Sequence, residues 1–386
     1  MPANIFSMQQ LTYLIWSADP ELFSLGTLSV RWYGLMFAIG FLVSQQIILH
    51  IFRKEGKPER DVETLTIVMV VATIIGARLG HVFFYEPARY LSDPISILKI
   101  WEGGLASHGA AFGIILALFL YSNYLIKIGT KGFTFRKRKR EGQSFLWVID
   151  RIVIVVAFTG CLIRIGNFFN SEIIGKPTGS DYGVVFARDI SRIIESSNNA
   201  ITGVEVSKNQ TSSRDESGRE GMYPVTVNIQ FKDLNYQEAD LRAFIETNIP
   251  ALLTYRSVGK HVEFNQGEDL VYRLKQTREG YRASVNTLAI VRHPAQLYES
   301  GTTLLLFFLL FFIWRRYREN TPEGLLFGLF LVILFSLRFV HEFFKENQVD
   351  FESDIPLNMG QWLSIPLIIT GILVLIRVMR KQKTTA

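Results

Sequence analysis

Arg78, Arg164 and Arg338 are three of the arginines that lie inside long apolar stretches of this sequence, where a charge is costly and usually functional. The stretches carry one carboxylate near them, Glu342, so guanidinium groups are in excess. Arginine binds phosphate oxygens through paired hydrogen bonds. We therefore expect a polar cavity that holds a phosphate group, and in a membrane the abundant phosphate belongs to phospholipid.

Each of these charges also has a simpler explanation when it is taken alone. Arg338 and Glu342 are four residues apart, so they can neutralise each other on one helix face. Arg78 and Arg164 can extend along their apolar stems to the membrane interface. The group as a whole favours the phosphate site, because one carboxylate cannot neutralise three arginines.

Three short segments combine glycines or polar side chains with the edge of an apolar stretch. They cover residues 101–109, 164–175 and 292–299. The first contains His108, a candidate proton acceptor. The second contains Asn167 and Asn170, of which we include Asn170 among the candidate substrate-binding residues.

The elements that position these residues are long apolar helices. Crossing a membrane takes about 20 mostly apolar residues. No stretch opens the chain behind a basic segment and a small-residue cleavage site, so we expect no removable signal peptide. Seven stretches qualify as spans: Tyr33–Ile51, Leu65–Tyr85, Leu105–Leu125, Leu146–Arg164, Ala295–Trp314, Leu325–Phe344 and Gln361–Val378.

Basic residues follow the first, third, fifth and seventh spans, and the densest run is Arg136–Arg140. The positive-inside rule places these segments in the cytoplasm. The N-terminus is then outside, the C-terminus is cytoplasmic, and the three arginines and His108 fall toward the outer face. A basic run can also bind nucleic acid. We interpret this one as a topology anchor at anionic lipid and expect no nucleic-acid partner.

Composition excludes several classes of protein. The chain is 48% hydrophobic and 20% charged, unlike an average soluble domain, which carries about 25% charged residues, and unlike a disordered chain. Its one cysteine, Cys161, rules out an intrachain disulfide and multi-cysteine zinc or iron–sulfur sites. Because Cys161 lies in an apolar run, we predict a buried thiol and not a nucleophile. We expect no metal and no cofactor.

Residues 170–291 differ from the spans, because they are polar and mixed in charge. Glu238–Asn248 has helical periodicity and is expected to end before Pro250. Three segments are expected strands: Pro224–Phe231, Val262–Phe264 and Tyr281–Val285. We therefore predict an all-α polytopic membrane protein with seven transmembrane helices and a small α+β extracytoplasmic domain. Its parts are an N-terminal membrane part at 1–169, the extracytoplasmic domain at 170–291 and a C-terminal membrane part at 292–386.

Seven segments of the sequence resemble, in order, the motifs of the prolipoprotein diacylglyceryl transferase family. Together they touch all seven spans, which is far more specific than one short motif. The segments are Arg31–Met36, Gly76–Gly80, Gly103–Gly109, Arg164–Gly175, Arg292–Glu299, Leu337–Phe344 and Met359–Pro366.

The resemblance implies a transferase of lipoprotein biosynthesis in the bacterial inner membrane. The family moves a diacylglyceryl group from phosphatidylglycerol to the lipobox cysteine thiol of a prolipoprotein, so that a thioether forms and glycerol phosphate leaves. The implied partners are phosphatidylglycerol, the prolipoprotein signal peptide with its lipobox cysteine, and membrane lipids.

The resemblance also assigns site residues by position. The family's essential residues fall on His108, Arg164 and Arg338. A thiol attacks as thiolate, His108 is a candidate proton acceptor, and the arginines can stabilise the leaving phosphate. Which residue takes the thiol proton stays open. The expected substrate-binding residues are Tyr33, Arg78, Asn167, Asn170, Glu172, Gly175 and Glu342, of which Arg78 and Asn170 come from our own analysis of the charges and polar segments.

The sequence departs from the family pattern in three places. Leu334 stands where a tyrosine is expected, and Lys345 stands where an arginine is expected, which keeps the charge without the planar fork. The outer segment is also longer than expected, so residues 187–288 are expected to include an added module.

Other classes of function remain as alternatives. A transporter of an anionic lipid or solute would share the charged cavity, but such proteins often contain repeated halves, and we find none. An intramembrane protease needs a facing nucleophile and base, whereas Ser107 and His108 are neighbours on one helix. A non-catalytic receptor would leave the arginines unexplained.

Overall fold

The computed structural model describes residues 13–26, 28–99, 103–104, 106–129, 132–137, 140–209, 221–232, 237–265, 267, 269–347 and 355–385. These residues form two compact units. The head unit takes in the described residues of 1–36, 164–299 and 340–358. The bundle unit takes in those of 37–163, 300–339 and 359–386. Four helices are therefore divided between the units, at Met36/Phe37, Ile163/Arg164, Glu299/Ser300 and Phe339/Val340.

Long apolar helices occupy the positions of all seven expected spans. Six are long and apolar enough to cross a membrane. The remaining position, that of the third expected span, holds α4, which is apolar but has only 17 residues. In chain order the helices are α1 (Trp32–Lys54), α2 (Glu59–Phe84), α4 (Ser107–Asn123), α5 (Phe145–Phe169), α8 (Ala295–Tyr317), α9 (Leu325–His341) and α10 (Met359–Thr385). The chain is thus a multi-pass membrane protein.

The bundle unit has an apolar core and an apolar surface. Phe52, Leu118, Ile154 and Leu310 are fully buried between helices. Large side chains such as Phe112 lie exposed on the helix surfaces. A helix that is apolar all round fits a lipid environment, where outward-facing hydrophobic residues carry no cost.

One polar cluster lies inside this apolar core. The Glu55 carboxylate receives two hydrogen bonds from Arg151 Nη2, at 3.0 and 2.9 Å, and one from Nε at 3.1 Å. The indole N–H groups of Trp147 and Trp314 donate to the same carboxylate at 2.9 and 2.6 Å. We call Glu55, Arg151, Trp147 and Trp314 the Glu55 cluster. It ties α5 and α8 to the residue that follows α1.

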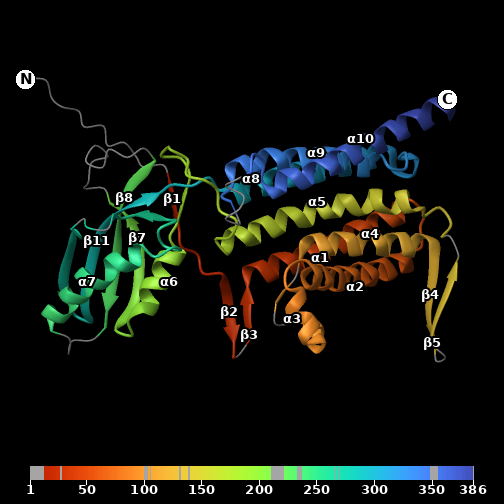
Figure 1. The fold of residues 1–386 in the computed structure, drawn as a ribbon. Helices are drawn as coiled ribbons and strands as arrows, with labels where there is room; N and C mark the ends of the chain where they lie inside the picture. Colours follow the sequence, from red (N-terminus) through yellow and green to blue (C-terminus); the bar gives the residue numbers. More distant parts are fainter. Residues whose placement is uncertain are drawn as a thin grey trace, which may run out of the picture. The chain divides into compact units, whose positions relative to one another are not determined.

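The head unit contains an antiparallel sheet in the order β10-β11-β8-β7, with the short β9 also pairing with β11. Figure 1 shows α6 and α7 lying against this sheet. The strands are β7 (Ile201–Lys208), β8 (Met222–Phe231), β9 (Val262–Glu263), β10 (Tyr272–Thr277) and β11 (Gly280–Ile290), and the helices are α6 (Arg188–Ser197) and α7 (Glu238–Leu253).

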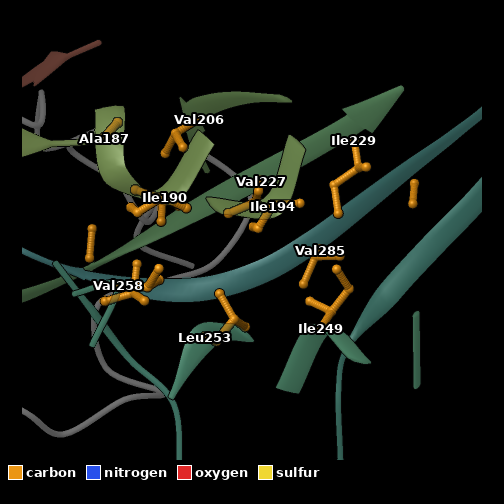
Figure 2. Close-up of a cluster of buried hydrophobic side chains, with 14 of the residues drawn as sticks. Ala187, Ile190, Ile194, Val206, Val227, Ile229, Ile249, Leu253, Val258 and Val285 are labelled. Atoms are coloured by element: carbon orange, nitrogen blue, oxygen red, sulfur yellow. The ribbon is translucent and has the colours of Figure 1, made fainter. Parts of the chain in front are cut away.

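Buried and partly exposed side chains alternate along β8, which explains how the helices pack on the sheet. Val225, Val227 and Ile229 are fully buried, whereas the intervening side chains point to the other face. Ile194 of α6 and Ile249 of α7 pack against the buried face (Figure 2). Both helices therefore cover the same face of the sheet and close one hydrophobic core.

A parallel strand pair in the head unit joins residues far apart in the sequence. β1 (Leu14–Trp16) pairs in parallel with β6 (Val184–Phe186). Tyr13 is buried in the head core and its hydroxyl donates to the Pro224 carbonyl at 3.3 Å. Burial and the nearby Tyr223 raise the pKa of Tyr13 to about 12, so its hydroxyl stays neutral.

The structure corrects two expectations. Three of the expected strands are confirmed as β8, β9 and β11, but α7 does not end before Pro250. It continues to Leu253 because Ile249 and Leu253 both pack in the core, which outweighs the hydrogen bond that the proline ring removes.

The expected membrane parts are also not purely helical. Of two further hairpins, β4–β5 (Tyr124–Gly129, Gly132–Lys137) belongs to the bundle unit and β2–β3 (Glu21–Leu25, Leu28–Arg31) belongs to the head unit. Short helical pieces add to them at α3 (Pro87–Ser92), η1 (Pro94–Leu98), η4 (Arg318–Asn320) and η5 (Glu342–Phe344).

Candidate active site

Close contact between α2 and α4 determines where His108 lies within the bundle unit. The two helices lie side by side (Figure 1), and a Cβ added at Gly80 would lie 2.6 Å from Gly109 Cα. A Cβ at Gly76 would lie 2.5 Å from the Gly109 carbonyl oxygen. Both helices carry glycines four residues apart, Gly76 and Gly80 against Gly109 and Gly113, which is the small-residue pattern of tight membrane helix pairs. This contact holds the first turn of α4 against the last turns of α2.

Aromatic rings at the end of α2 surround the His108 imidazole. Phe84 meets it edge-on at a centroid distance of 5.4 Å, and Tyr85 stacks on it at 5.7 Å. The Tyr85 ring also stacks on the His81 ring, at a centroid distance of 5.4 Å. The His108 ring is partly exposed, so it is held in place and still reachable.

Arg78 is buried, and its hydrogen-bond donors are all used by the backbone. Nε donates to the Ile97 carbonyl at 2.8 Å, and Nη1 donates to Gly103 and Gly104 at 2.5 and 3.3 Å. Nη2 donates to the carbonyls of Ser96 and Lys99 at 2.5 and 3.2 Å. Arg78 as a whole residue is 4% exposed, and its guanidinium carbon lies 4.9 Å from the centroid of the Tyr90 ring. Arg78 therefore holds the segment that leads into α4 and His108.

Arg338 lies in the last turn of α9 and belongs to the bundle unit. It shares the continuous helical segment Leu325–Phe344 with Glu342, and the segment changes from α to 3-10 geometry between them, since α9 ends at His341 and η5 begins at Glu342.

The head unit brings the second group of predicted residues together at the end of α5. Arg164 Nη1 donates to Asn167 Oδ1 at 3.4 Å, and Asn167 Nδ2 donates to one oxygen of Glu172 at 3.2 Å. Asn170 Nδ2 donates to the other oxygen of Glu172, also at 3.2 Å. Tyr33 interacts electrostatically with Arg164 and Glu172. Five of the predicted site residues thus form one polar group.

A strained backbone turn shapes this group. Ser171 and Ile173 have φ values of 54° and 56°, which non-glycine residues adopt rarely and which cluster at functional sites. Gln296 Nε2 fixes the turn by donating to the Glu172 carbonyl at 2.5 Å. A Cβ at Gly175 would lie 2.3 Å from the His293 carbonyl oxygen, so only glycine fits where the chain passes this neighbour.

Two charged residues that the sequence analysis did not assign to the site complete this group. Glu299 forms ion pairs with Arg164 and with Lys345. Lys345 Nζ also donates to Glu342 Oε1 at 2.9 Å, and Asn358 Nδ2 donates to Glu342 Oε2 at 3.1 Å. Glu299 is the last residue of the polar segment 292–299. Its position at the start of a span was the feature of the sequence that could have indicated a site residue. Arg164 therefore has a carboxylate partner that the sequence analysis did not count, and the excess of arginine over carboxylate is smaller than we expected.

Arg292 and His293 brace the same region from the start of α8. Arg292 is buried and donates from Nη1 to the Gly175 carbonyl at 2.9 Å and to Glu346 at 2.6 Å. Its Nε donates to the Lys260 carbonyl at 2.8 Å. Burial lowers the pKa of His293, whose Nδ1 lies 3.2 Å from the Tyr298 hydroxyl.

The predicted burial of Cys161 is confirmed. The residue is 4% exposed, and its sulfur lies 3.1 Å from the Ser300 hydroxyl within the bundle unit. Within the described ranges, no group of three or more His, Cys, Asp or Glu residues is placed to hold a metal ion.

Comparison with known proteins places this chain in a family. The family description "Prolipoprotein diacylglyceryl transferase" matches residues 20–377. A phosphatidylglycerol–prolipoprotein diacylglyceryl transferase of Chloroherpeton thalassium is 33% identical over 376 residues, which is 97% of this chain and 98% of that protein. The protein of the same name from Tolumonas auensis is 32% identical over 363 residues, which is 94% of this chain and 96% of its own length. With seven motif segments in order and a match along nearly its whole length, the chain belongs to the prolipoprotein diacylglyceryl transferase family.

Proposed function

We propose that this protein transfers the diacylglyceryl group of phosphatidylglycerol to the lipobox cysteine thiol of prolipoproteins. The family match over residues 20–377 carries the proposal. The cysteine thiolate attacks the glyceryl carbon next to the phosphate, a C–S bond forms as the C–O bond breaks, and the electron pair leaves with glycerol phosphate. The reaction needs groups that accept the thiol proton and stabilise the departing phosphate.

The proposed catalytic residues are His108, Arg164 and Arg338. His108 accepts the proton of the incoming thiol, which its partly exposed ring allows. Arg164 and Arg338 stabilise the charge that develops on the phosphate. The transfer assay below tests the role of His108 and of Arg164 separately.

The residues that we expected to bind substrate divide into three tasks, two of which are supporting ones. Asn167, Asn170, Glu172 and Tyr33 form the polar group around Arg164 and bind the glycerol and phosphate oxygens. Gly175 and Glu342 keep the strained turn and the charged partners of Arg164 in place. Arg78 contributes by holding the backbone that leads to His108.

We also propose the orientation and division of the chain. Seven crossings, with α4 as the third, put the N-terminus outside and the C-terminus in the cytoplasm of a bacterial inner membrane. The parts are 1–169 and 292–386 in the membrane, with 170–291 as the extracytoplasmic domain. A cysteine introduced at the exposed Thr202 should react with a membrane-impermeant reagent from outside. Labelling only after the membrane is permeabilised would reverse this orientation.

The test of function is transfer of labelled lipid from phosphatidylglycerol to a lipobox peptide by the purified protein. His108→Gln should keep some hydrogen bonding and lose proton transfer, a step that typically contributes a factor of about 10²–10⁴. Near-normal transfer by folded His108→Ala or Arg164→Ala protein would reject the assignment of these residues. A folded wild-type protein that transfers no lipid would instead favour a transporter of an anionic lipid or solute.

A further inference from the structure

Four charged side chains of the head unit form an alternating chain: Arg164, Glu299, Lys345 and Glu342. Arg164 Nε pairs with Glu299, Glu299 pairs with Lys345, and Lys345 donates to Glu342 at 2.9 Å. The side chains of Glu299, Lys345 and Glu342 are 8%, 2% and 7% exposed, whereas Arg164 is 21% exposed. The accessible end of this buried chain is therefore the guanidinium group of Arg164.

The point of attachment on Arg164 matters for its chemistry. Glu299 binds at Nε, on the side of the guanidinium fork, and Asn167 accepts from Nη1 only at 3.4 Å. The end of the fork that carries both Nη groups is one of the two edges that can bind phosphate oxygens in pairs. A carboxylate at Nε fixes the plane of the fork and leaves that edge for a second ligand.

Lys345 gives the buried carboxylate of Glu299 a second cationic partner, so that Glu299 does not depend on Arg164 alone. A buried ion needs a partner, and Glu299 has two cationic partners instead of one. Lys345 is held in place by backbone pairing, because residue 345 forms a β-bridge with Gly175 and Lys176 N–H donates to the Phe344 carbonyl at 2.8 Å. The backbone that carries the counter-charge is thus fixed by the fold.

We propose that Glu299 is a positioning residue that orients Arg164 toward the phosphate of the lipid substrate, with Lys345 as its buried counter-ion. This inference rests on the proposed function, since it assigns Arg164 to the phosphate. It adds two residues that act through Arg164 and do not themselves touch substrate.

The test compares the same substitution at the buried glutamate of two arginine–glutamate pairs. Glu299→Gln removes the charge beside Arg164, and Glu55→Gln removes the charge beside Arg151 in the bundle unit. Since misplacing a group that acts in the transition state lowers kcat, Glu299→Gln should lower kcat by about 10- to 100-fold, with KM for phosphatidylglycerol changed less than about threefold. Folded Glu55→Gln protein should keep kcat within about twofold.

Lys345 supplies a second route that does not depend on the folding of Glu299→Gln. Lys345→Met should lower kcat, whereas Lys345→Arg keeps the charge and should stay within about threefold of wild type. The conservative variant separates loss of charge from general damage at this position.

Two results would overturn the inference: wild-type kcat in folded Glu299→Gln or Lys345→Met, or an equal loss of kcat in Glu55→Gln. A wild-type protein that forms no lipidated peptide would refute the proposed function. An active wild type with unaffected Glu299→Gln and Lys345→Met variants would refute only this positioning role.

Discussion

The Glu55 cluster of the bundle unit and the charged chain at Arg164 of the head unit are both built on an arginine–glutamate pair with a buried glutamate, yet they differ in how many of the arginine's donors are used. Arg151 donates three hydrogen bonds to the Glu55 carboxylate, and the indole N–H groups of two tryptophans donate two more. The side chains of this pair are 1% and 0% exposed. Arg164 has one ion pair, one long hydrogen bond and a partly exposed side chain.

The difference separates a structural charge from one available for chemistry. A fully satisfied buried pair has no donor left to offer and serves to hold helices together. An arginine fixed on one side only can still bind a substrate anion. Burial of a charge is therefore a weaker indication of function than the number of its donors that remain open.

The sharpest test of this comparison is Arg164→Lys. Lysine keeps the charge and loses the planar fork, so transfer should fall by roughly 10³-fold, or about 4 kcal/mol in the activation free energy. The melting temperature should change little. Arg242→Lys in the head unit, where Arg242 pairs with Glu238 at an exposed site, is the control and should transfer normally. Full activity of Arg164→Lys would show that the fork is not used.

Glu55→Gln should produce the opposite pattern. It leaves Arg151 buried without its counter-charge, which should lower the free energy of unfolding by about 3 kcal/mol, since removing one partner of a buried pair is strongly destabilising. Thermal unfolding in detergent measures this, with the exposed Glu63→Gln as control. An unchanged midpoint would mean that the Glu55 cluster does not stabilise the bundle.

His261 of the head unit extends the comparison to a buried group that is incompletely satisfied. Burial, with Arg292 nearby, lowers its pKa from 6.5 to about 4, and its Nδ1 is buried without a hydrogen-bond partner within the described residues. The unfolded chain binds more protons between these values, so this stabilisation is complete above pH 6.5 and is lost as pH falls toward 4. The loss should reach about 2 kcal/mol at pH 5.

Hydrogen exchange of the β8 and β11 amides, corrected for the intrinsic effect of pH, measures this loss. His261→Gln should flatten the dependence on pH. An equally steep dependence in that variant would assign the acid sensitivity to other groups.

The smallest effect is expected for a neutral contact in the bundle unit. The hydroxyls of Ser44 on α1 and Thr159 on α5 lie 2.9 Å apart. Ser44→Ala should cost about 0.5 kcal/mol, because hydrogen bonds between membrane helices contribute little on average. If Ser44→Ala lowered the free energy of unfolding as much as Glu55→Gln, neutral polar contacts would hold these helices together as strongly as the fully hydrogen-bonded Arg151–Glu55 pair. That result would contradict our comparison.

The sequence predicted where the long helices lie, because apolar stretches of sufficient length are visible locally. It also predicted that Arg164, Asn167, Asn170 and Glu172 gather, since they share one short segment. It could not distinguish Arg78 from Arg164. Both are arginines in apolar surroundings, but Arg78 meets carbonyls of the segment 96–104 and Arg164 meets a carboxylate on another helix.

The sequence by itself thus determined the family, the apolar helices and the residue types of the site, all of which are encoded in local patterns of hydrophobicity and motif order. Only the tertiary structure decided that β1 pairs with β6, that α7 continues past Pro250, and that Glu299 lies between Arg164 and Lys345. These features depend on which distant side chains share a packed core, and burial there outweighs the local preferences that a sequence reveals.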